Sequence, residues 1–187
     1  MSQGPTGVRV LLVPGLWNSG PEHWQSYWER ERADCRRVEQ LDWETPHRED
    51  WVSTLERAVR DTAGPVVLAA HSLGCVTVAH WAQLAGPQAL AKVWGALLVG
   101  PSDAEAPSYP PGTVGFAPVP HNRLPFPSVV VASANDEYVT VARAAEFARA
   151  WGSEFVNVGE KGHVNSASGL GAWAEGQALL DRLIGER

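Results

Sequence analysis

Cysteine is scarce in this sequence: Cys35 and Cys75 are the only two in 187 residues. One pair cannot form the disulfide framework on which small secreted domains depend. The N-terminal stretch MSQGPTGVRVLLVPG also lacks a basic region, a long apolar run and a cleavage site, so it does not resemble a secretory signal. A protein without a disulfide framework or a secretory signal suits a reducing compartment, so the expected location is cytoplasmic.

Basic residues are also in the minority, with 15 Lys and Arg against 21 Asp and Glu and a net charge of −6. No basic patch is visible, so no nucleic-acid partner is expected. No apolar run reaches the roughly 18 residues of a membrane-spanning helix, so no membrane partner is expected. Hydrophobic residues make up 44% of the chain, which is enough for a sizeable core. We expect one domain over residues 1–187 and favour a monomer.

The sequence does contain short apolar runs that alternate with longer amphipathic segments. The apolar runs predict strands over residues 8–13, 36–41, 66–70, 93–99, 128–133 and 154–158. The amphipathic segments predict helices over residues 21–33, 49–62, 73–84, 141–151 and 170–183. This order favours an α/β fold with a six-stranded, mostly parallel sheet and helices on both of its faces.

One segment interrupts the alternation. Residues 100–127 contain eight prolines, a density that forbids a long helix or a central strand. They are Pro101, Pro107, Pro110, Pro111, Pro118, Pro120, Pro125 and Pro127. We expect this Pro-rich segment to be an ordered loop or a short lid.

Three reactive residue types follow three of the predicted strands. Ser72 lies in AHSLG after the third strand, Asp136 follows the fifth and His163 follows the sixth. Ligands of open parallel sheets bind beyond the carboxyl ends of the strands, so these residues are expected to meet there. The chain order serine, acid, histidine is the order of α/β-hydrolases. Their nucleophile signature is Gly-x-Ser-x-Gly, and Ala70 replaces its first glycine with a residue that is still small.

The three residue types form a complete set for nucleophilic catalysis. A serine hydroxyl needs a base to take its proton, and a neutral imidazole can do so near neutral pH. A carboxylate on the other ring nitrogen holds the imidazole in the required tautomer. The developing oxyanion needs backbone N–H donors, for which we expect Leu73 and, from the loop after the first strand, Leu16, with Trp17 as the second choice.

Four sequence blocks are long and unusual: VPGLWNSGPEHWQSYWE, AHSLGC, GFAPVPHNRLPFPSVVVASANDEYV and GHVNSASGLGAW. They resemble the retinoblastoma-binding-protein-type small serine hydrolases, and the resemblance covers nearly the whole chain. It implies a compact α/β-hydrolase fold without a large cap domain. It also places the family's nucleophile, acid and base on Ser72, Asp136 and His163.

The sequence departs from that family at two places. Glu137 stands where many relatives have proline after the acid. The Leu-x-Cys-x-Glu motif behind the family name is incomplete here, because LGCVT, which begins at Leu73, has no glutamate. We therefore expect no retinoblastoma-type partner.

Several residues have alternative interpretations. Asp103, after the fourth strand, is the rival acid. Trp17 either lines the substrate pocket or packs against the protein, and His71 is either structural or shapes the pocket. Cys75 is expected to be a buried small hydrophobe. The remaining histidines and most tryptophans are expected to fill structural positions: His23, His47, His80, His121, Trp24, Trp28, Trp51, Trp81, Trp151 and Trp173. Asn165 and Ser168 are expected to brace the histidine loop and to start the last helix.

The predicted function is a serine hydrolase that cleaves a small-molecule ester, or an amide, through a covalent acyl-enzyme. No cofactor is expected, and no metal, because His-x-x-x-His and Cys-x-x-Cys spacings are absent. Two alternatives stay open: a non-catalytic binding protein on a hydrolase scaffold, and a cofactor-free perhydrolase or lyase that uses the same triad.

Overall fold

The computed structural model describes residues 7–185. Its six strands are all parallel, in the order β2-β1-β3-β4-β5-β6. The strands are β1 (Arg9–Val13), β2 (Cys35–Arg37), β3 (Val66–His71), β4 (Val93–Val99), β5 (Ser128–Ala132) and β6 (Glu154–Asn157). The helices are α1 (Trp24–Glu31), α2 (Arg48–Asp61), α3 (Leu73–Leu84), α4 (Pro87–Lys92), α5 (Val141–Trp151), the short 3-10 helix η1 (Ser166–Ser168) and α6 (Ala174–Gly185).

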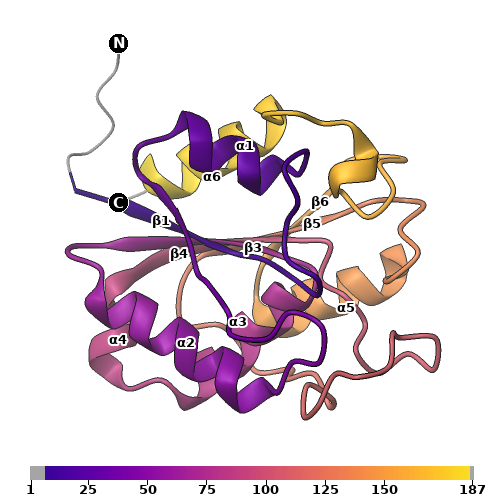
Figure 1. Cartoon of the computed structure of the whole chain (residues 1–187), viewed down its shortest axis with the longest axis horizontal. Coiled ribbons are helices and arrows are strands. Elements are labelled where there is room, and N and C mark those ends of the chain that lie inside the picture. The colour runs from indigo at the N-terminus through magenta and orange to yellow at the C-terminus, as the bar shows by residue number, and fades with distance from the viewer. Residues whose placement is uncertain (1–6, 186–187) are drawn as a thin grey trace.

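The sheet is a middle layer with helices on both faces (Figure 1). Helices α1 and α6 cover one face, and α2, α3, α4 and α5 cover the other. Each face has its own buried apolar cluster, because alternate residues of a strand point to opposite sides. Leu11 and Val13 of β1 belong to one cluster, whereas Val10 and Leu12 belong to the other. The predicted α/β-hydrolase fold is therefore confirmed, with a sheet that is wholly rather than mostly parallel.

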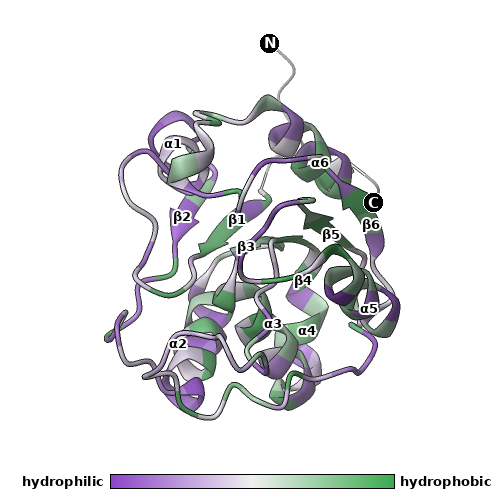
Figure 2. Cartoon of the chain, turned by 90° about the vertical axis from the view of Figure 1, so that its right-hand side faces the viewer, coloured by the Kyte–Doolittle hydropathy of each residue, from purple (hydrophilic) through white to green (hydrophobic). Residues whose placement is uncertain are grey.

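Burial explains which strands the sequence predicts well. All residues of β3 and β5 are buried, so these strands appear in the sequence as continuous apolar runs. Edge strand β2 has the sequence Cys-Arg-Arg and is coloured hydrophilic in Figure 2, whereas β5 is hydrophobic. The prediction of a strand over residues 36–41 was wrong about its end, because β2 stops at Arg37 and Leu41 is 89% exposed.

Two predicted helices begin later than expected. The prediction over residues 21–33 was wrong at its start, because the His23 side chain caps α1 by accepting a hydrogen bond from the Gln25 N–H. The prediction over residues 170–183 was wrong by four residues, because Gly171 and Trp173 have φ of 54° and 44°, outside the range of an α-helix. Helix α4 was not predicted. It has six residues, with Gly86 at its N-cap and a proline at its start.

The Pro-rich segment contains no helix or regular strand within residues 100–127, as predicted. Val114 forms one isolated parallel bridge with His47. Arg143 of α5 pairs with Asp103 and Glu105, which ties the start of this segment to the helix. In the described part of the chain, no helix is long and apolar enough to cross a membrane.

Candidate active site

Ser72 occupies the sharp turn between β3 and α3. Its φ of 55° and ψ of −122° are strained for a residue with a side chain, and its N–H donates to the Val99 carbonyl at 2.9 Å. The turn requires Gly74, since a Cβ there would lie 2.2 Å from the Val13 carbonyl oxygen. Ala70, in contrast, is fully buried in the sheet and pairs in register with Val13 and Leu98. The turn therefore forms with alanine in place of the signature's first glycine.

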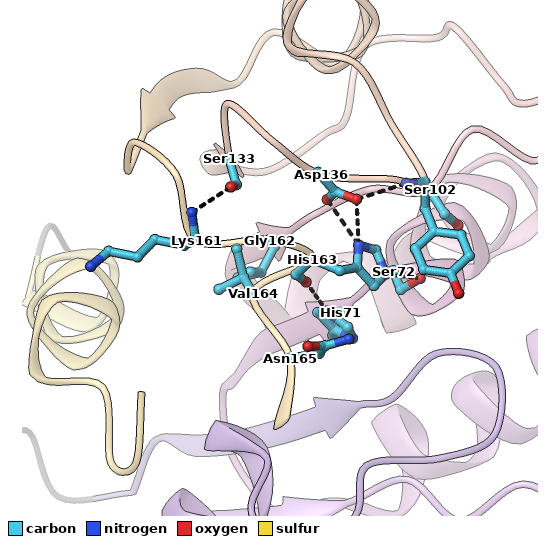
Figure 3. Close-up of polar contacts among 12 residues, drawn as sticks. His71, Ser72, Ser102, Ser133, Asp136, Lys161, Gly162, His163, Val164 and Asn165 are labelled. Carbon is cyan, nitrogen blue, oxygen red and sulfur yellow. Dashed lines mark hydrogen bonds and ion pairs between the residues drawn. The ribbon is translucent and has the colours of Figure 1, made fainter. Parts of the chain in front are cut away.

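Ser72, His163 and Asp136 lie in one hydrogen-bonded line. The Ser72 Oγ is 2.8 Å from His163 Nε2, and His163 Nδ1 is 2.8 Å from both carboxylate oxygens of Asp136. A carboxylate only accepts, so Nδ1 carries the imidazole proton and Nε2 is free to accept the Ser72 hydroxyl proton. Figure 3 shows Asp136 and Ser72 on opposite sides of the His163 ring.

The two candidate acids have different partners in the structure. The Asp136 side chain is fully buried beside His163 and also accepts a hydrogen bond from the Tyr138 N–H at 2.8 Å. Asp103 instead faces Arg143, with Nε and Oδ1 3.4 Å apart. Gly100 makes room for the pair, since a Cβ there would lie 3.3 Å from Asp136 Oδ2 and 3.5 Å from the His163 ring. Asp136, rather than Asp103, therefore lies on the imidazole.

The loop after β1 approaches the Ser72 turn closely. A Cβ on Gly15 would lie 2.7 Å from Ser72 Cβ and 3.1 Å from the Leu73 nitrogen, so the glycine keeps open the space beside this N–H. Within residues 7–185, the N–H groups of Leu16 and Leu73 donate no hydrogen bond. The Trp17 N–H donates to the Trp43 carbonyl at 2.9 Å, which removes the second-choice oxyanion donor.

Trp17 and Asn18 both have a left-handed φ of 65°. Asparagine tolerates this left-handed conformation, but tryptophan rarely adopts it. The Asn18 N–H closes the turn onto the Gly15 carbonyl at 3.1 Å. The Trp17 side chain is 55% exposed, so core packing does not explain its position, and it lines the mouth of a cavity at Ser72.

This cavity has a volume of about 210 Å³. Twelve residues from six separate parts of the chain line it: Leu16, Trp17, Asn18, His23, His71, Ser72, Tyr109, Pro110, Tyr138, His163, Asn165 and Ser166. Tyr109 and Pro110 show that the Pro-rich segment forms part of its wall. Among residues 7–185, no group of three or more His, Cys, Asp and Glu side chains is placed to hold a metal ion.

His23, for which the sequence predicted only a structural position, also lines the cavity, and His71 is both structural and part of the cavity. Their rings are connected, with His23 Nε2 3.3 Å from His71 Nδ1, and His71 Nε2 is 2.8 Å from the His163 carbonyl oxygen. Burial lowers the pKa of His23 to about 3, helped by the positive charge of Arg37 and by His163. Burial also lowers the pKa of His71 well below its usual value. No local motif marks His23, because its position depends on where α1 packs.

The loop that carries His163 is braced as predicted. The Asn165 Oδ1 accepts from the Ala167 N–H, and the Ser168 hydroxyl accepts from the Asn165 N–H and donates to the Lys161 carbonyl. The further expectation that these residues start the last helix was wrong, since they cap η1 and α6 begins at Ala174.

The residues expected to be structural include a buried set of tryptophans. Trp24, Trp28, Trp51, Trp81, Trp151 and Trp173 are all at most 4% exposed, although Trp173 precedes its helix. Cys75 is fully buried, as expected.

Comparison with known proteins identifies the family. The sequence profile described as serine hydrolase matches residues 10–182. The chain belongs to this serine hydrolase family. Among curated proteins, no match was found.

Solved structures agree with this family membership. A protein assigned as a YdeN-like hydrolase from Pectobacterium atrosepticum is 32% identical, with a TM-score of 0.83 over 95% of this chain and 91% of that chain. The ydeN gene product from B. subtilis is 19% identical, with a TM-score of 0.76 over 97% and 100% of the two chains. A thermophilic esterase from Thermogutta terrifontis is 16% identical, with a TM-score of 0.68 over 96% and 90%, and shares the fold. Family and neighbours together support hydrolase activity.

Proposed function

We propose that this member of the serine hydrolase family hydrolyses an ester through a covalent acyl-enzyme formed on Ser72. The observation that carries the proposal is the unbroken line from Ser72 Oγ through His163 to Asp136, with each contact at 2.8 Å. Ser72 is the nucleophile, His163 the general base and acid, and Asp136 the residue that orients the imidazole.

The proposed reaction has two steps, acylation of Ser72 and hydrolysis of the acyl-enzyme. The Ser72 Oγ forms a bond to the ester carbonyl carbon while its proton passes to His163 Nε2. The ester C–O bond then breaks, and the leaving alcohol takes that proton from His163. Water attacks the acyl-enzyme, gives a proton to His163 and releases the acid, and the proton returns to Ser72. The Asp136 carboxylate, which accepts a hydrogen bond from Nδ1–H of His163, stabilises the imidazolium that forms in each step.

Two backbone N–H groups are proposed as the oxyanion donors. The Leu73 N–H begins α3, where the helix dipole also favours negative charge, and the Leu16 N–H comes from the loop after β1. Both groups lack an acceptor in the described part of the chain, and Gly15 leaves space beside Leu73. A developing oxyanion would satisfy both donors.

The substrate is proposed to be a small-molecule ester, with an amide as the second choice for the same machinery. We also propose that the chain is related to the retinoblastoma-binding-protein-type hydrolases, because four of its sequence blocks resemble theirs. No cofactor is needed for any step above.

A fluorophosphonate probe tests the proposal, because it reacts covalently only with an activated serine. We expect the wild type to be labelled and Ser72→Ala to remain unlabelled. Ser108→Ala, which removes an exposed hydroxyl of the Pro-rich segment, is the matched control and should be labelled like the wild type. Labelling that persists in Ser72→Ala would move the nucleophile elsewhere. A wild type that reacts with no probe would favour a non-catalytic binding protein, and peracid formation faster than ester hydrolysis would favour a perhydrolase.

A further inference from the structure

The cavity beside Ser72 is lined mainly by neutral side chains. Among the described residues that line it, none is Lys, Arg, Asp or Glu. Its polar side chains are two carboxamides, two serines, two tyrosines and three histidines: Asn18, Asn165, Ser72, Ser166, Tyr109, Tyr138, His23, His71 and His163. The charge of the cavity therefore depends on the state of its histidines.

Hydrogen bonds fix His23 and His71 as neutral imidazoles. A carbonyl oxygen only accepts, so His71 Nε2 must carry the proton that it donates to His163 at 2.8 Å. His71 Nδ1 then accepts from His23 Nε2. At the other end, His23 Nδ1 accepts the Gln25 N–H at 3.1 Å. The chain of bonds is consistent from both ends, and it leaves neither ring with a nitrogen free to bind a ligand.

Burial keeps both rings neutral. His23 is 3% exposed and His71 is 5% exposed, and the pKa of each lies well below neutral pH. These histidines present only carbon and ring faces to the cavity. They can neither pair with a substrate carboxylate nor accept a hydrogen bond from a substrate ammonium.

The cation behind the cavity, Arg37, is also unavailable. Its Nε and Nη2 bind Glu29 at 3.0 Å and 2.9 Å, and Nη2 also donates to Ser26 Oγ at 2.7 Å. Its Nη1 donates to Asn18 Oδ1 and to the Ser19 carbonyl, both at 2.8 Å. Four of the five guanidinium N–H groups thus donate hydrogen bonds, and the charge of the group is paired with the Glu29 carboxylate. A carboxylate in the cavity would therefore find no partner at Arg37.

The carboxylate behind the cavity, Asp136, is similarly engaged. Its side chain is fully buried, and its oxygens accept from His163 and from the Tyr138 N–H. A substrate ammonium would have no free carboxylate to bind. A charge of either sign would thus lose water without gaining a partner of opposite charge, which is unfavourable.

We propose that the cavity receives the acyl group of the substrate and selects an uncharged one. This inference rests on the proposed ester hydrolysis at Ser72 and deepens it. The cavity volume of about 210 Å³ is equivalent to roughly seven water molecules. That volume suits a short acyl group whose carbonyl lies at Ser72.

Two pairs of phenyl esters of matched size test the selection, with phenol release measured and spontaneous hydrolysis subtracted. The first pair is phenyl 4-oxopentanoate, which is neutral, and monophenyl succinate, which is anionic at pH 7. The second pair is phenyl pentanoate and phenyl 4-aminobutanoate, which is cationic. We expect kcat/KM for each charged ester to be at least about thirtyfold below that of its neutral partner. Values within about threefold in both pairs would overturn the inference.

A variant pair tests the physical reason. Ser166 is exposed at the edge of the cavity, so Ser166→Lys adds a cation there and Ser166→Gln adds a neutral chain that also ends in a nitrogen donor. The ratio of succinate to oxopentanoate kcat/KM should rise about tenfold in Ser166→Lys and stay unchanged in Ser166→Gln. An unchanged ratio in both variants would show that charge does not govern the selection.

Labelling of Ser72 and turnover of the neutral esters separate the charge selection from ester hydrolysis itself. If fluorophosphonate labels Ser72 and both neutral esters turn over, but the charged esters keep pace, then only the charge selection is wrong. If Ser72 is not labelled and no ester is cleaved, the proposed function itself is wrong, and this inference falls with it.

Discussion

The buried neutral pair His23 and His71 makes the stability of this fold sensitive to acid. In the unfolded chain, His23 has a pKa near 6.5, whereas in the folded protein burial lowers its pKa to about 3. The unfolded state therefore binds a proton as the pH falls below about 6.5, and the folded state does not until about pH 3. The stability that His23 confers is thus complete above pH 6.5 and is lost progressively as the pH falls from there to about 3.

The size of the effect follows from the pKa difference. At pH 5, about 1.5 units below the unfolded pKa and well above the folded one, the loss through His23 is about 2 kcal/mol at 1.36 kcal/mol per unit. His71 is shifted in the same direction for the same reason and adds to the loss. A small domain has a total stability of roughly 5–15 kcal/mol, so this change is measurable.

His23→Asn isolates the contribution of His23. The asparagine side chain can still accept the Gln25 N–H at the start of α1, but it does not titrate. It loses the bond to His71, so we expect the variant to be about 1–2 kcal/mol less stable at pH 8. Because the wild type loses about 2 kcal/mol through His23 by pH 5, the two stability curves should converge there.

Urea unfolding followed by tryptophan fluorescence at several pH values from 5 to 8 gives these free energies by linear extrapolation. His71 stays buried in both proteins, so the difference between the curves reports the loss of His23 together with its effect on His71. Parallel curves across the whole range would refute the reasoning, because they would mean that His23 binds the same number of protons in the folded and unfolded chains.

Three further predictions concern the acid, the turn and the strained loop. Asp136→Asn should lower kcat by roughly 10⁴-fold, because the imidazole would lose its tautomer, whereas Asp103→Asn, which removes a partly exposed pair with Arg143, should leave kcat little changed. Gly74→Ala should destabilise the fold by about 3 kcal/mol or prevent folding, because the new Cβ would clash with the Val13 carbonyl. Gly86→Ala is the control and should leave stability little changed, because open space surrounds the position of the new Cβ and φ is −73°. Trp17→Gly should relieve backbone strain of about 1–3 kcal/mol, partly offset by the greater conformational entropy of the unfolded chain. Its kcat/KM should fall, because the Trp17 side chain no longer forms part of the cavity wall.

Each of these predictions has an outcome that contradicts it. A larger loss of kcat in Asp103→Asn than in Asp136→Asn would assign the orientation of His163 to Asp103 instead of Asp136. Equal melting temperatures for Gly74→Ala and Gly86→Ala would mean that the turn is not tightly packed. A Trp17→Gly protein that is strongly destabilised and fully active would make that tryptophan a packing residue.

The sequence predicted the fold well where strands are buried on both faces. β3 and β4 are continuous apolar runs, and their predicted bounds match those in the structure to within one residue. The prediction was poorer at the periphery, where hydrophobic periodicity is weak. β2 is a short edge strand of polar composition, and the start of α6 is fixed by the conformations of Gly171 and Trp173.

The sequence alone predicts the alternation of strands and helices, and with it the edge of the sheet at which Ser72, Asp136 and His163 lie. Parallel strands end at one edge, so residues that follow them are brought together whatever their separation in the chain. Tertiary packing placed Asp136 rather than Asp103 against the His163 ring, paired the Trp17 N–H with the Trp43 carbonyl and joined His23 to His71. These outcomes depend on distances between loops far apart in sequence, and packing of whole elements sets such distances.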